Sequence, residues 1–398
     1  MRTKIEYKRV LVCGCEVANL INSYTEALKD KGYNVKNCSF FRNNYYLDNK
    51  YDYEIRIWLS KLNNKYINYF ERALRKFLLF FVLFWRFDIY IYIWNQTFLP
   101  FKIDLFLLRI IGKKVIVVHC GSDVRYAPIQ SKIDISHFTT HYFANNDTEN
   151  FEKHLRKTSS FTRKFFTQWL TELSGASIIS MRSQATFQGR KSYFFRFPQI
   201  QISSEAKKAK KLPLIIHAPT DRSGKGTKYV LAAIDALIKD GKSFEFELIE
   251  NKNNDYVLQR LKDADIVIDQ PGPWFGRLGV ESFASGCALI SGNNYEYYGI
   301  KNESPAIQFD PNGSSLRENL EKLIIDSELR QSKMNAGFLY WQSHYSYAAF
   351  INYIEDIFSN KNGDNIFFPP KNHKSFLLKH AENRFQKFII YLLYRSKE

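Results

Sequence analysis

A loop rich in polar and small residues carries the clearest chemical signal in this 398-residue sequence. It reads His217-Ala-Pro-Thr-Asp-Arg-Ser-Gly-Lys-Gly-Thr227 and follows a short apolar stretch typical of a strand. Arg222 and Lys225 supply two cations, and Gly226 and Thr227 open the next expected helix. Cations beside the unpaired N–H groups of a helix N-terminus bind phosphate groups. We therefore predict a diphosphate site; the alternative is an ordinary surface loop. His217 is expected to be a hydrogen-bonded residue at the strand end and not a base.

A second segment, DQPGPWFGRLGVESFASGCALI, spans residues 269–290. From Pro273 onward it resembles the donor-site segment of GT-B glycosyltransferases, in particular the large retaining group called family 4. That group has two glutamates with seven residues between them, followed by a helix of small residues and a buried strand. Phe275, Gly276 and Glu281 stand at the family's positions, whereas Pro273 stands where the first glutamate is found.

The resemblance implies a role for Glu281 alone, and its neighbours in the segment are candidates for further contacts. Glu281 would accept hydrogen bonds from the ribose of a nucleotide sugar, and Gly276 and Arg277 are candidates for contacts to its phosphate and sugar. Trp274 would border the sugar or simply cap the core. The two cations of the first loop resemble the arginine and lysine that bind the diphosphate in this family, at a shorter spacing.

A third segment, His119-Cys-Gly-Ser-Asp-Val-Arg125, follows another apolar stretch. It resembles the family's segment of the form His-x-Gly-x-Asp, which follows a strand of the N-terminal domain and faces the cleft. The resemblance implies that His119, Asp123 and Arg125 contact the donor sugar or the acceptor. The alternative is a turn in which an aspartate and an arginine satisfy each other.

No metal and no cofactor are expected, the nucleotide sugar being a substrate. The pair Asp263-Ala-Asp265 has the spacing of a metal-binding motif, but it closes an expected helix directly before a strand. Carboxylates at the end of a helix are expected to face solvent. The resemblance also implies that a helix dipole and cations, instead of a metal, bind the diphosphate.

Apolar runs alternate with helical patterns along the chain. Strands are expected at residues 10–13, 88–94, 114–119 and 176–180, with helices at 17–31 and 105–111. After a segment without periodicity, strands are expected at 214–217, 244–249, 266–269 and 288–290, with helices at 226–239, 256–262, 279–286 and 315–326. This alternation predicts an α/β fold with open parallel sheets. Together with the resemblance it predicts two Rossmann-like domains facing a cleft, the GT-B architecture.

The charge distribution supports a division into two domains. Residues 1–212 contain 35 of the 57 Lys and Arg residues but 17 of the 40 Asp and Glu residues, a net charge of +18. We expect a basic acceptor-side domain at 1–198, a linker at 199–212, a nucleotide-sugar-binding domain at 213–345 and C-terminal helices at 346–398. The last are expected to pack on the first domain or on a membrane.

Two basic and aromatic stretches, residues 61–85 and 374–398, resemble helices that lie on membranes. The first contains five cations, Lys61, Lys65, Arg72, Arg75 and Lys76, beside an apolar run of nine residues, 77–85, which is too short to span a bilayer. We predict contact with an anionic membrane surface; the alternatives are a core helix and a crossing helix. No nucleic-acid motif accompanies the charge, so no nucleic acid is expected as a partner. With five scattered cysteines and no signal peptide, we expect a cytoplasmic protein at the inner face of the membrane.

These observations predict a glycosyltransferase that moves a sugar from a nucleotide sugar to a glycan or lipid-linked acceptor. The resemblance implies a hexosyltransferase-like, retaining enzyme in the synthesis of a cell-surface polysaccharide, lipopolysaccharide or glycolipid. The alternative is a non-catalytic, transferase-like protein that binds polyanions or membranes, for which Pro273 is the best support.

Overall fold

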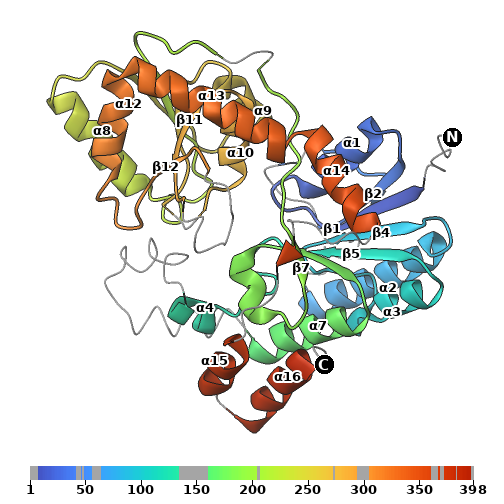
Figure 1. Ribbon diagram of the computed structural model, residues 1–398. Helices are drawn as coiled ribbons and strands as arrows, with labels where there is room; N and C mark the ends of the chain where they lie inside the picture. The colour runs from blue at the N-terminus through green and yellow to red at the C-terminus, as the bar shows by residue number, and fades with distance from the viewer. Residues whose placement is uncertain are drawn as a thin grey trace. The chain divides into compact units, whose positions relative to one another are not determined.

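The chain divides into two compact units in the computed structural model (Figure 1). The structure describes residues 8–41, 46, 49–55, 64–133, 160–203, 207–271, 274–293, 304–359, 366–367, 372–381 and 383–395. The first unit comprises Met1–Ala127, Ser159–Phe195 and Ile351–Glu398, and the second comprises Pro128–Thr158 and Arg196–Phe350. The chain therefore returns to the first unit at its C-terminal end.

An eight-stranded sheet forms the centre of the first unit, in the order β13-β7-β6-β5-β4-β1-β2-β3. Its strands are β1 Arg9–Cys15, β2 Asn34–Phe41, β3 Tyr53–Glu54, β4 Ile89–Ile93, β5 Lys114–Val118, β6 Ser177–Ser180, β7 Ser192–Phe194 and β13 Ile366–Phe367. Only the β13–β7 pair is antiparallel among the described pairs. The middle strands β4 and β5 are buried almost throughout, as expected for a parallel sheet covered on both faces.

Helices cover the two faces of this sheet (Figure 1). On one face lie α2 Lys65–Leu83, α3 Ile103–Ile110, preceded by the short η3 Pro100–Lys102, and α7 Phe161–Leu173; on the other lie α1 Leu20–Asp30 and α14 Tyr347–Phe358. The C-terminal helix α16 Arg384–Arg395 packs on α7, and α15 His373–His380 packs on α16. Two short helices, α4 Ala127–Ile133 and η5 Arg182–Phe187, complete the described helices of residues 1–195.

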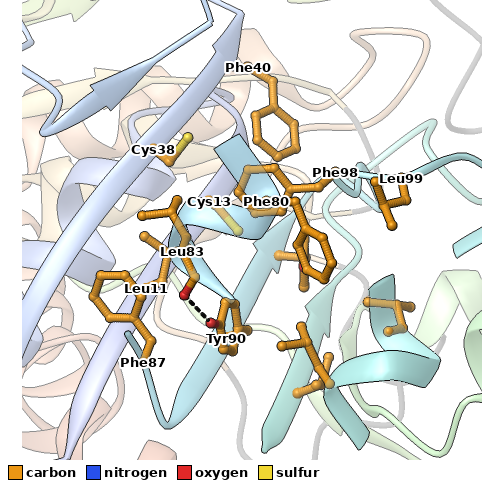
Figure 2. Packing of buried hydrophobic residues seen from close by; sticks show 14 of the residues in the cluster. Leu11, Cys13, Cys38, Phe40, Phe80, Leu83, Phe87, Tyr90, Phe98 and Leu99 are labelled. Atoms are coloured by element: carbon orange, nitrogen blue, oxygen red, sulfur yellow. Dashed lines mark hydrogen bonds between the residues drawn. The ribbon is translucent and has the colours of Figure 1, made fainter. Parts of the chain in front are cut away.

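The core between the sheet and α2 mixes aromatic with aliphatic residues (Figure 2). Phe80 and Leu83 of α2 are fully buried against Leu11 of β1 and Tyr90 of β4. Burial of one such side chain contributes roughly 1.5–3 kcal/mol. The Tyr90 hydroxyl donates to the Leu83 carbonyl oxygen at 2.7 Å, so a polar group inside this core is paired at the C-terminal end of α2.

A five-stranded parallel sheet forms the second unit, in the order β12-β11-β10-β8-β9. Its strands are β8 Leu214–His217, β9 Glu245–Leu248, β10 Ile266–Ile268, β11 Ala288–Ser291 and β12 Ile307–Gln308. Its helices are α8 Thr227–Lys239, α9 Asn254–Leu261, α10 Arg277–Ala284, α12 Leu316–Ile325 and α13 Ser327–His344. The chain runs outward from β8 to β9 and then back to β10, so β8 and β10 flank a topological switch point. Ligands of open α/β sheets bind beyond the strand ends at such a point.

The α/β fold class expected from the sequence is confirmed, but the expectation for one carboxylate is wrong. Asp263 faces solvent as expected, with 61% of its side chain exposed. Asp265 is buried, and its carboxylate accepts the N–H groups of Lys210 and Leu214, each at 3.0 Å. These bonds attach the segment before β8 to the start of β10. The position of Asp265 at the entrance of a buried strand therefore decides its environment.

No helix of the described residues is long and apolar enough to cross a membrane. Within that same part of the chain, no three His, Cys, Asp or Glu side chains gather in a way that could hold a metal ion.

Candidate functional site

His217, the last residue of β8, fixes the start of the predicted diphosphate loop. Its Nδ1 lies 2.8 Å from the Ile268 carbonyl oxygen and its Nε2 lies 2.9 Å from Thr227 Oγ1. Because a carbonyl only accepts, Nδ1 carries the proton and Nε2 accepts from the threonine hydroxyl. Burial lowers the pKa of His217 to about 4. The ring is therefore neutral at pH 7, and the prediction of a hydrogen-bonded strand-end histidine is confirmed.

Lys225 projects from this loop toward the end of β10. Its Nζ lies 2.6 Å from Asp269 Oδ1 and 2.7 Å from Gln270 Oε1. The Asp269 side chain is fully buried, while 17% of the Lys225 side chain is exposed. The ammonium group is thus fixed at the carboxyl ends of β8 and β10, the neighbouring strands at the switch point.

Arg222, the other predicted cation of the loop, has a separate partner. Its Nε and Nη2 donate to the two carboxylate oxygens of Glu250 at 2.7 and 2.6 Å. The pair lies on the surface, with 60% of the Arg222 side chain exposed. The loop is shaped by Asp221, whose carboxylate accepts the N–H of Gly224 at 2.7 Å. The same loop therefore presents Lys225 in a partly buried setting and Arg222 in solvent.

Gly226 and Gly276 stand at the N-termini of α8 and α10. Gly226 has a φ of +65°, and a Cβ there would lie 2.9 Å from Pro271 Cγ, so glycine suits both the conformation and the space. Gly276 donates its N–H to Asp269 Oδ2 at 2.6 Å. Asp269 therefore joins Lys225 to the first residue before α10, and the two predicted phosphate-binding segments meet at one carboxylate.

Trp274 and Phe275 precede α10 and anchor it. The two rings lie 4.6 Å apart, and the buried Phe275 ring also packs edge-on against Phe283 and Tyr345. The Trp274 carbonyl oxygen accepts from Gln270 Nε2 at 2.7 Å. Pro273, which stands in place of the family's first glutamate, lies outside the described residues.

Glu281 is almost wholly buried on α10, with 2% of its side chain exposed. Its Oε1 accepts from Arg277 Nε at 3.0 Å and from Asn254 Nδ2 at 3.2 Å. Burial raises the pKa of Glu281, and the two donors act in the opposite direction. Arg277 also donates from Nη2 to Gln199 Oε1 at 2.8 Å. The predicted ribose acceptor thus belongs to a network that holds Arg277 beside it.

His119, Asp123 and Arg125 gather in the first unit, after β5. His119 Nδ1 lies 3.0 Å from Asp123 Oδ2, and Asp123 Oδ1 accepts the N–H of Gly121 at 3.0 Å. Burial raises the pKa of Asp123, but the hydrogen bond and the charge of His119 outweigh it, and the pKa is lowered. Arg125 Nε donates to the Gly121 carbonyl oxygen at 3.1 Å. His119 Nε2 is buried and has no hydrogen-bond partner among the described residues.

Asp269, Gln270 and Asn254 were not predicted as site residues. The sequence does contain a pattern that could have identified Asp269, because a carboxylate directly after the buried strand β10 stands at the edge of the sheet where ligands bind. No sequence pattern identifies Asn254, the first residue of α9, because its contact with Glu281 joins residues 27 positions apart.

Comparison with known proteins identifies the architecture through structure alone. The sequence matches no protein-family model and no curated protein. Sucrose-phosphate synthase from Thermosynechococcus elongatus superimposes with a TM-score of 0.58 at 10% identity, covering 89% of this chain and 98% of that one. An alpha-glucosyltransferase in complex with UDP and a 13-mer DNA gives a TM-score of 0.56 at 11% identity, covering 88% and 99%. Both neighbours are GT-B glycosyltransferases, so the chain has the GT-B fold.

Proposed function

We propose that this chain is a glycosyltransferase whose second unit binds a nucleotide-sugar donor. The observation that carries the proposal is the position of Lys225, 2.6 Å from the buried Asp269, whose other oxygen accepts the N–H of Gly276 at the start of α10. A cation and a helix N-terminus converge there at the switch point of the sheet. This is the combination that binds a diphosphate. An alpha-glucosyltransferase of the same fold forms a complex with UDP-glucose, which supports a donor of this class.

The reaction breaks the bond between the sugar C1 and the diphosphate oxygen and forms a bond from C1 to an acceptor hydroxyl oxygen. The diphosphate departs with the electron pair and takes up the proton that the acceptor hydroxyl loses. Lys225, Arg222 and the N-terminal end of α8 would stabilise the charge that develops on the diphosphate. Removing one preorganised donor of this kind costs about 10²–10³-fold in turnover.

Other residues take supporting roles in this proposal. Glu281 accepts from the ribose, and Gly276, Arg277, Trp274 and Phe275 form the phosphate and sugar end of the donor site. The proposed site needs neither a metal nor a cofactor.

The first unit contributes the acceptor side. His119, Asp123 and Arg125 contact the transferred sugar or the acceptor. The buried Nε2 of His119, which has no hydrogen-bond partner within the described part of the chain, is the group available to a substrate hydroxyl. Because a carboxylate holds Nδ1, the ring keeps a fixed orientation.

The acceptor is proposed to be a glycan or a lipid-linked sugar at the cytoplasmic side of a membrane. The basic N-terminal half and the apolar surface described below support this placement. Membership of the retaining family 4 group, a hexosyl substrate and a role in polysaccharide, lipopolysaccharide or glycolipid synthesis belong to the same proposal. Three of the matched structures are complexes of an alpha-glucosyltransferase with DNA, but no nucleic-acid motif accompanies the charge of this chain, so DNA is not proposed as its acceptor.

Calorimetric titration tests the donor site. At least one of UDP, GDP, ADP and dTDP should bind at least tenfold more tightly than its nucleoside. Lys225→Ala should remove most of this difference, because it deletes a contact to the phosphates and none to the nucleoside. Lys228→Ala, in the first turn of α8, is the matched control. If no diphosphate binds better than its nucleoside, the non-catalytic alternative is the better account.

A further inference from the structure

The outer side of α2 exposes a continuous row of large apolar side chains. Eight residues of α2 and Trp85 in the turn after it form this surface, which we call the α2 apolar face: Tyr66, Tyr69, Phe70, Leu74, Phe77, Leu78, Phe81, Val82 and Trp85. Between 46% and 74% of each is exposed. They recur every three or four residues, and the exposed Ile67 and Ala73 lie along the same side. A 19-residue helix is about 28 Å long, so the row runs along its whole length.

The cations of α2 lie on its other side. The Arg72 guanidinium lies 4.0 Å from the ring centroid of Phe41, and the Lys76 ammonium lies 4.3 Å from that of Phe40. Burial lowers the pKa of Lys76. Farther along the same inner side, Phe80 is fully buried in the core. The helix thus turns its charges inward and its apolar residues outward, the reverse of an ordinary surface helix.

Arg75 does not interrupt the α2 apolar face. Its Nε donates to Glu71 at 2.7 Å, and the Glu71 side chain is nearly buried. Lys61 and the side chain of Lys65 lie outside the described part of the chain. Among the five cations expected to meet an anionic membrane, Arg72, Arg75 and Lys76 are therefore engaged by the protein itself.

The chemistry of this face fits a lipid bilayer better than a protein. Its central residues offer no hydrogen-bonding atom in their side chains, whereas a protein interface typically carries about ten hydrogen bonds. Its polar atoms lie at the ends, in the hydroxyls of Tyr66 and Tyr69 and the indole of Trp85. Tyrosine and tryptophan prefer the boundary between acyl chains and headgroups. The net charge of +18 on residues 1–212 complements an anionic leaflet.

We infer that the α2 apolar face lies in the plane of a lipid bilayer surface and inserts its side chains among the acyl chains. The inference deepens the membrane placement proposed above and does not depend on the donor site. Arg72 and Lys76 face the protein core and cannot pair with lipid headgroups. The free energy of membrane binding by α2 therefore comes from the insertion of its apolar side chains. Association with vesicles therefore persists at high salt, where electrostatic attraction is screened within about 3 Å.

Vesicle flotation tests this inference without any nucleotide. The variant carries Leu78→Glu and Phe81→Glu, both on the α2 apolar face. The matched control carries Ile238→Glu and Ile325→Glu, two side chains of the second unit that are 59% and 62% exposed. Wild type and control should float with phosphatidylcholine–phosphatidylglycerol vesicles at 0.1 M and 1 M NaCl. The variant should lose at least tenfold in the bound fraction. Thermal unfolding of all three proteins checks that the substitutions leave the fold intact.

Two results would overturn the inference: wild type stays unbound, or the folded variant floats as well as wild type. Sedimentation then distinguishes a further role, if it shows a wild-type dimer that the variant converts to a monomer. The α2 apolar face would then be an interface between two copies of the chain. Since none of these measurements uses a nucleotide sugar, they leave the proposed activity to its own test.

Discussion

Lys225 Nζ and Asp269 Oδ1 are 2.6 Å apart at the ends of two neighbouring parallel strands. The other oxygen of Asp269 accepts the N–H of Gly276. One carboxylate thus occupies both the cation and the helix N-terminus proposed to bind a diphosphate. A bound diphosphate has to displace Asp269 from Lys225 or share the ammonium group with it.

Asp269→Asn should therefore strengthen nucleoside diphosphate binding, by about tenfold or 1.4 kcal/mol. The substitution removes a negative charge from the phosphate position while keeping an oxygen that can accept from Gly276. The ligand-free protein should be less stable by about 3 kcal/mol, because a partly buried ammonium group loses its partner. Calorimetry and urea denaturation measure the two effects. Asp263→Asn, in an exposed carboxylate, should change neither, and weaker diphosphate binding by Asp269→Asn would contradict the competition.

Glu281→Gln should reduce the preference for ribonucleotides over 2′-deoxyribonucleotides. A hydrogen bond from the ribose to a carboxylate contributes roughly 1.5–3 kcal/mol, and an amide accepts more weakly. Binding of ribo- and deoxyribo-diphosphates to both proteins gives the comparison, with Glu318→Gln on the surface of α12 as control. Equal preferences in wild type and variant would remove Glu281 from the ribose site.

The sequence patterns located the elements around the donor site well. The strand expected at residues 214–217 is β8, and the helix expected at 226–239 is α8, which begins one residue later, at Thr227. The boundaries of these elements can be predicted from the sequence because an apolar run ends at a glycine-containing loop. In contrast, β2 was missed because its polar residues are buried. Asn37 exchanges two hydrogen bonds with Asp52, so it satisfies its polar groups inside the sheet.

The partners of the site residues could not be predicted from the pattern. Lys225 and Asp269 are 44 positions apart, and nothing in either local sequence indicates the other. The same holds for α2, whose two sides both contain apolar residues. Only the fold shows that Arg72 and Lys76 stack on rings of β2 while Phe77 and Phe81 face outward.

Protein stability should fall as the pH drops from about 6.5 to about 4 because of His217. Its pKa is lowered to about 4 by burial, so the unfolded chain binds the proton more tightly in this range. The stability contributed by the neutral ring is complete above pH 6.5 and is lost progressively below it, by about 3 kcal/mol in total. Urea midpoints between pH 4 and 7 should fall more steeply in wild type than in His217→Asn. Parallel curves would show that His217 is not the titrating group.

His119→Gln should lower turnover about 10²-fold without weakening diphosphate binding, because His119 belongs to the first unit and the diphosphate loop to the second. Steady-state rates at saturating donor, together with calorimetry, separate the two effects. His380→Gln on α15 serves as a control for replacing a histidine of the same unit. An unchanged rate in His119→Gln would remove this residue from the acceptor side.

The release of nucleoside diphosphate from a panel of nucleotide sugars tests the central claim most directly. Purified wild type should release diphosphate from at least one donor, and addition of a glycan or lipid-linked acceptor should accelerate the release. Lys225→Ala should reduce the rate about 10²-fold, and Lys228→Ala should leave it unchanged. Release by wild type and Lys225→Ala at the same rate, or no release from any donor, would contradict a glycosyltransferase that works through this loop.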